Sequence, residues 1–208
     1  RLRTVPTHAI PRKPIVGVAG DIYTRVNGFA NGDLFHRLEA LGCEVWPAPF
    51  SVDLFAFNQP RFAMKAARRW DLKPMFHTAF LTTVREMEEW WQSLHWDLDE
   101  RFSEPSIKEV RELAAPYVGP ESSSLVTLNV AKMADFAKRG ADGVVNAICF
   151  GCMVGGISAA LLQKMRDDNG GIPMATINYG GSGGSDGSAR LEAFAHQVKR
   201  FHARRSAQ

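Results

Sequence analysis

Two cysteines, three positions apart, are the side chains best suited to chemistry in this sequence of 208 residues. Cys149 and Cys152 follow a short apolar run, residues 144–148, and two glycines come soon after them. A Cys-x-x-Cys pair is typical of a redox dithiol, of half a zinc site or of part of an iron–sulfur site. Packed thiols are the plainer alternative, because a free cysteine behaves as a small hydrophobe. No second Cys or His pair follows at the spacing of a structural zinc site.

A second group of candidates follows the first apolar run of the chain. Within eleven residues lie four polar side chains and a basic one: Asp21, Tyr23, Arg25, Asn27 and Asn31. Arg25 is expected to hold a phosphate or a carboxylate, since a guanidinium can bind either with two parallel hydrogen bonds. We expect Tyr23, Asn27 and Asn31 to assist it in binding an anion or a substrate.

A glycine-rich stretch, residues 180–187, lies just before the last predicted helix. Backbone N–H groups at a helix N-terminus can bind an anion, which makes the stretch a further candidate site. It has neither the Gly-Lys-Ser/Thr ending of a P-loop nor a Gly-x-Gly-x-x-Gly pattern early in a fold. A flexible loop without a ligand is an equally good interpretation.

Alternating strands and helices must position these residues. Short apolar runs predict strands at 14–20, 43–46, 143–148 and 172–177, and amphipathic patterns predict helices between them, one of them over 124–138. The alternation predicts a three-layer α/β fold with a mostly parallel sheet of about four strands. We expect residues 1–13 to be an arm or linker and 14–208 to be the α/β domain, with a helical insertion over about 51–115. Ligands bind beyond the carboxyl ends of parallel strands, where this fold places both candidate sites.

The net charge, the length of the apolar runs and the number of cysteines limit the functional classes that fit this chain. A net charge of +3 is too weak to indicate nucleic-acid binding, and no apolar run approaches the roughly 20 residues of a membrane span. Three cysteines, an odd number, do not make a disulfide framework, so a reducing, cytoplasmic setting is expected. The sequence starts without Met, which suggests a fragment.

Four segments in the same order resemble a known family. Residues 20–31, GDIYTRVNGFAN, resemble the GEIYxRxxPFxN segment of proteins related to the 2-hydroxyacyl-CoA dehydratase activase group. Residues 38–46, LEALGCEVW, resemble the helix and strand that follow that segment. Residues 150–155, FGCMVG, are similar to the family's PFxCMPG, and residues 189–194, ARLEAF, to its TRLEAF. The similarity is weakest over about residues 55–115, and the family's YDGQ is here Tyr179-Gly-Gly-Ser.

The resemblance implies the C-terminal portion of a longer protein in the superfamily of 2-hydroxyacyl-CoA dehydratase and benzoyl-CoA reductase subunits. Those subunits bind iron–sulfur clusters through cysteines from several segments, and an ATP-hydrolysing activator supplies their electrons. The match makes Cys152 a cluster ligand, whereas Cys149 stands where the family often has proline or another residue. A CoA thioester is implied as the substrate class, and the rest of a longer chain or a partner subunit as the source of further ligands.

From these points we expect an iron–sulfur module of an ATP-dependent dehydratase- or reductase-like system. The alternative is a non-catalytic α/β module that binds a small anion through Arg25 and the glycine-rich stretch, with its cysteines merely packed. The third cysteine, Cys43, comes at the start of its predicted strand, so it should lie at the opposite edge of the sheet from Cys152. This chain alone is therefore not expected to hold an intact cluster, because a four-iron cluster needs four ligands.

Overall fold

The computed structural model describes residues 11–49, 103–180 and 186–207, together with Arg101 and scattered residues between 75 and 90. The chain divides into two compact units, residues 1–12 with 51–106 and residues 13–50 with 107–208. The described residues between 75 and 90 belong to the first unit and are helical. Most of the predicted insertion lies outside the described residues; its last part, Ile107–Ala114, is helix α6 of the second unit.

The second unit is built on a four-stranded sheet of parallel strands in the order β2-β1-β3-β4. The strands are β1 (Ile15–Gly20), β2 (Glu44–Pro47), β3 (Gly143–Cys149) and β4 (Met174–Tyr179). This confirms the predicted α/β fold with its parallel sheet. β4 begins two residues later than predicted, after Pro173, whose nitrogen carries no hydrogen to donate to the ladder.

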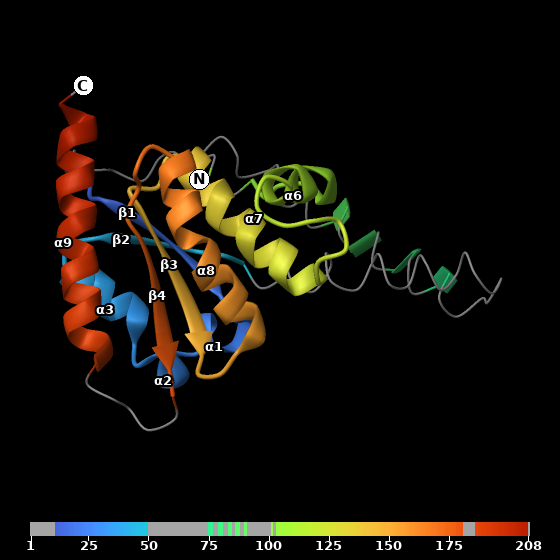
Figure 1. The fold of residues 1–208 in the computed structure, drawn as a ribbon, viewed down its shortest axis with the longest axis horizontal. Helices are drawn as coiled ribbons and strands as arrows, with labels where there is room; N and C mark the ends of the chain where they lie inside the picture. Colours follow the sequence, from blue (N-terminus) through green and yellow to red (C-terminus); the bar gives the residue numbers. More distant parts are fainter. Residues whose placement is uncertain are drawn as a thin grey trace, which may run out of the picture. The chain divides into compact units, whose positions relative to one another are not determined.

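Helices cover both faces of the sheet (Figure 1). One face carries α7 (Ser124–Lys138), which has the predicted bounds, and α8 (Met153–Asp168), and α6 packs against α7. The other face carries α3 (Leu34–Ala40) and α9 (Asp186–Ser206). Because side chains alternate along a strand, Ile15 and Ala19 join the core under α7, whereas Val16 and Val18 join the core under α3 and α9. Within the described part of the chain, no helix has the length and apolar character needed to cross a bilayer.

The polar composition of the segment after β1 favours a loop, but the structure shows helices there. The segment folds into two short helices, α1 (Ile22–Val26) and α2 (Gly28–Asn31). Asp21 caps the first by accepting the Thr24 N–H at 2.8 Å, and Asn27 caps the second by accepting the Ala30 N–H at 3.0 Å. These side chains supply the acceptors that helix N-termini lack, which explains why so short a segment becomes helical.

Candidate functional site

Cys149 ends β3 and Cys152 begins α8, so a tight turn holds the two thiols at the carboxyl edge of the sheet. The Cys152 N–H donates to the Cys149 carbonyl at 3.2 Å, and Gly151 takes a left-handed conformation, with φ of +74°. Glycine adopts this conformation without the steric penalty of other residues. Both thiols are free and half-exposed, so the predicted placement of the pair is confirmed.

Cys152 acts as the N-cap of helix α8, which starts at Met153. The sulfur lies 3.5 Å from the Gly155 nitrogen, whose N–H it accepts. The positive end of a helix stabilises nearby negative charge, so this sulfur is well placed to act as an anionic ligand. An added Cβ would meet nothing within 4 Å at Gly151 or Gly156, so a bulky group can approach the backbone there.

The neighbouring thiol of Cys149 has a different electrostatic setting. Burial raises the pKa of Cys149, and the nearby Cys152 and Asp21 raise it further. The two thiols lie on one tight turn, which places them where both could contact one common ligand. Charge repulsion opposes the deprotonation of both thiols at once, and a bound cation removes this cost.

Large apolar side chains are exposed around the thiols. Phe150, between the two cysteines, is 82% exposed, and Met153 lies one position after them and is also exposed. In the segment after β1, Tyr23 is exposed and Phe29 is 97% exposed. That segment lies next to the end of β3, where the Asp21 N–H donates to the Ala147 carbonyl at 2.8 Å. The turn that carries the cysteines is therefore flanked by the exposed apolar side chains of Phe150 and Met153, as a surface that another segment covers would be.

Arg25 requires a correction, because its guanidinium is not available to an anion. The residue is only 2% exposed, and its side chain donates to the carbonyls of Gly20 at 3.0 Å, Ala48 at 3.1 Å and Pro49 at 3.1 Å. Those carbonyls lie at the end of β1 and just after β2. Arg25 thus ties two strand ends together and has a structural role.

Two of the other predicted anion ligands, Asn31 and Asn27, also make structural hydrogen bonds. Asn31 is buried; its amide donates to the Arg25 carbonyl at 3.1 Å, and its oxygen accepts the N–H of Leu34, the first residue of α3, also at 3.1 Å. The Asn27 side-chain oxygen accepts the Ala30 N–H and so caps α2. Tyr23 is exposed and Asn27 is half-buried.

A buried polar cluster under α8 was not predicted. Asn146, in the middle of β3, accepts from the Asn129 amide at 3.1 Å and donates to the Thr176 hydroxyl at 3.3 Å, while Asn129 also donates to Ser158 at 2.9 Å. The four residues come from α7, β3, α8 and β4. The only sequence signal was one asparagine inside an otherwise apolar run, residues 144–148.

Cys43 lies apart from the other two cysteines, as predicted. It precedes Glu44, which pairs with Ile15 at the start of β1, whereas Cys149 pairs with Tyr179 at the end of β4. Its side chain is 1% exposed, and burial raises the pKa of its thiol. Among the described residues, no group of three or more His, Cys, Asp and Glu side chains gathers where it could hold a metal. This part of the chain therefore offers two converging thiols.

The burial of Cys43 predicts two classes of thiol. In the native protein at pH 8, a disulfide reagent such as DTNB should titrate two of the three thiols, and all three in denaturant. Removing Cys43 (Cys43→Ala) should leave the native count at two. A native count of three, or a lower native count in Cys43→Ala, would contradict the buried position.

Comparison of the chain with protein-family models, with curated proteins and with solved structures finds no match. The functional assignment therefore depends on the chemistry of the site itself and on the motif resemblance of its residues.

Proposed function

We propose that this chain is an iron–sulfur module of an electron-transferring system related to ATP-dependent acyl-CoA dehydratases and reductases. The supporting observation is the pair of free thiols, Cys149 and Cys152, at the carboxyl edge of a parallel sheet and the N-terminus of a helix. Iron–sulfur clusters are held by thiolates, so the donor chemistry fits. When bound, such a cluster supplies one-electron chemistry that amino-acid side chains lack.

The residues fit part of a cluster site. Cys152 is the main ligand in this proposal, because it falls on the family-like motif and caps α8. Cys149 lies on the same turn, three residues before Cys152, and can act as a second ligand. Cys43 is too deeply buried at the other edge to join them. The remaining ligands of a four-iron cluster would come from another segment or from a partner subunit, which would also cover the exposed Phe150 and Met153.

The surrounding chain would tune and protect the cluster. The open backbone at Gly151 and Gly156 lets a cluster approach closely, and N–H groups at the helix start would favour negative charge on the sulfurs. A reducing compartment, the cytoplasm, would keep the thiols available as ligands. The substrate class, a CoA thioester, and an ATP-hydrolysing activator follow from the motif resemblance.

The rival function, a small-anion-binding module, is less well supported. Its main ligand was Arg25, which is buried and bonded to three carbonyls. The stretch 181–185 of its proposed glycine-rich loop lies outside the described residues.

Cysteine variants test the proposal. After anaerobic purification of the full-length protein with any partner subunit, iron and acid-labile sulfide should fall sharply in Cys152→Ser and much less in Cys149→Ser, because Cys152 is the main ligand. Cys43→Ser, with a buried thiol, is the matched control and should retain the wild-type iron content. Equal loss in the first two variants would make both residues obligatory ligands, and wild-type iron in Cys152→Ser would refute the assignment.

A further inference from the structure

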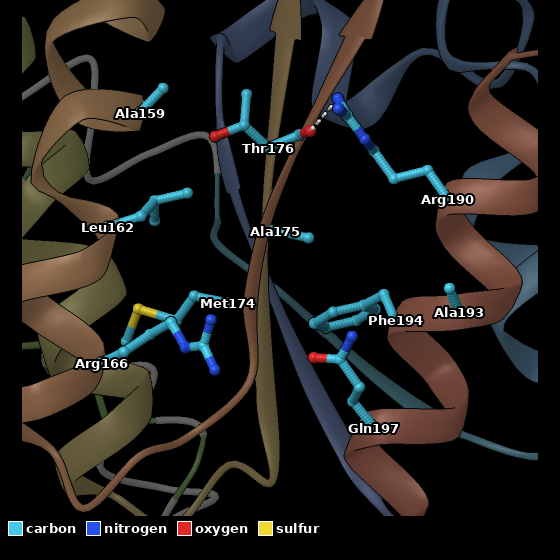
Figure 2. A pocket seen from close by; sticks show the side chains of 10 residues that line it. All are labelled: Ala159, Leu162, Arg166, Met174, Ala175, Thr176, Arg190, Ala193, Phe194 and Gln197. Carbon is cyan, nitrogen blue, oxygen red and sulfur yellow. Dashed lines mark hydrogen bonds between the residues drawn. The ribbon is translucent and has the colours of Figure 1, made fainter.

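A groove runs along β4, the last strand of the sheet in the order β2-β1-β3-β4. Its volume is about 380 Å³, and its walls come from α8 on one face of the sheet and α9 on the other (Figure 2). Its lining reaches Met174 and Thr176, in the first half of β4, whereas Cys149 pairs with Tyr179 at the far end. The groove is therefore separate from the cysteine site.

Among the residues that the structure describes, no strand pairs with the outer edge of β4, which forms the floor of this groove. The Val144 N–H donates to the Pro173 carbonyl, and the Phe150 N–H donates to the Tyr179 carbonyl, so odd-numbered residues of β4 turn their backbone groups toward β3. The backbone groups of Met174, Thr176 and Asn178 must then point away from the sheet, because the direction alternates along a strand. The Arg190 side chain donates to the Thr176 carbonyl at 3.4 Å, which agrees with this direction.

The groove combines apolar walls with two cations. Leu162 from α8 and Phe194 from α9 supply apolar surface on opposite sides of β4. Arg166 extends from α8 beside Met174, and Arg190 extends from α9 to Thr176 (Figure 2). None of the described residues that line the groove is acidic. Its electrostatic complement is therefore a negatively charged occupant.

We propose that β4 binds an extended acidic segment of a partner protein, which adds a fifth strand to the sheet. Strand addition satisfies the outward backbone groups of an edge strand and takes its specificity from side-chain contacts. Side chains of an extended segment alternate between the faces of the sheet, while Arg166 and Arg190 lie on opposite faces. The segment therefore carries carboxylates at an odd spacing, such as adjacent Asp and Glu.

A second copy of this chain is a poor occupant of the same edge. Pairing two copies of β4 would bring two sets of Arg166 and Arg190 together, and like charges in one interface oppose association. A small dicarboxylate could contact the arginines, but it would not use the outward backbone groups of Met174, Thr176 and Asn178. One experiment can therefore distinguish an acidic peptide segment from a second copy of the chain and from a small dicarboxylate.

The test measures fluorescence anisotropy of a labelled eight-residue peptide, Thr-Val-Thr-Asp-Glu-Val-Thr-Val, with the full chain. Asn178→Pro removes one outward N–H, and Asn178→Ala, at the same exposed position, keeps it. We expect Asn178→Pro to weaken peptide binding by about tenfold and Asn178→Ala to leave it within about twofold. Arg166→Gln combined with Arg190→Gln should weaken it by about tenfold as well. A peptide with Lys-Lys in place of Asp-Glu should not bind.

Several outcomes would overturn the proposal. Equal peptide binding by the proline and alanine variants would show that the strand edge is not used. Displacement of the peptide by succinate, with succinate affinity unchanged in Asn178→Pro, would identify a small-anion site. Concentration-dependent dimerisation that Asn178→Pro abolishes would identify a second copy as the occupant. The arginine variants keep the test decisive if the proline variant unfolds, which circular dichroism would reveal.

Discussion

Replacing Arg25 with alanine is expected to lower the free energy of unfolding by about 3–5 kcal/mol, an effect typical of removing a buried, hydrogen-bonded charge. The substitution takes away the donors of three carbonyls, those of Gly20, Ala48 and Pro49. It also leaves a cavity where one of the largest fully buried side chains stood. Denaturant unfolding of the native chain and of the variant measures the loss.

Two variants control this prediction. Arg25→Lys keeps the charge but cannot reach all three carbonyls, so it should cost roughly half as much. Arg200→Ala, on the exposed side of α9, should change stability by less than about 0.5 kcal/mol. An Arg25→Ala variant as stable as the native chain, with weakened binding of a phosphate or a carboxylate, would restore the anion-binding role.

Gly20→Ala is expected to cost about 3 kcal/mol or more, through backbone strain and steric overlap together. Gly20 has a φ of +121°, and an added Cβ would lie 2.0 Å from the Ala147 carbonyl oxygen. That oxygen belongs to β3, which pairs with β1 at this point, so it cannot move away without breaking the ladder. Thermal and denaturant unfolding should both show the loss.

Gly156→Ala is the matched control for Gly20→Ala. An added Cβ at Gly156 meets nothing within 4 Å, and the residue lies inside α8. Alanine there should stabilise the chain by up to about 1 kcal/mol, because it favours the helix. A Gly20→Ala variant that unfolds with the same midpoint as the native chain would show that β1 and β3 are not as close as described.

The features that could be predicted from the sequence are those that depend on short-range patterns of apolar and polar residues. The run 143–148 is apolar on both faces because helices cover both sides of β3, and the periodic apolar positions of α7 indicated its bounds, Ser124–Lys138. The turn of Cys149 and Cys152 followed from its place between that strand and the next amphipathic run. The carboxyl-edge position followed from parallel topology.

Contacts between distant segments could not be predicted in the same way. Arg25 appeared to be a ligand because nothing near it in the sequence shows that the carbonyls of Ala48 and Pro49 return to meet it. The cluster around Asn146 joins residues of four elements. The groove along β4 exists because that strand is an edge, and strand order is set by the packing of the whole sheet.

The central claim, that Cys149 and Cys152 serve an iron–sulfur cluster, is tested most directly by electron paramagnetic resonance of the full-length protein, purified anaerobically together with any partner subunit. The account predicts a brown protein with a broad visible absorbance, a paramagnetic signal on reduction with dithionite, and loss of that signal in Cys152→Ser but not in Cys43→Ser. A colourless protein that takes up no iron after anaerobic reconstitution, and shows no signal on reduction, would contradict it.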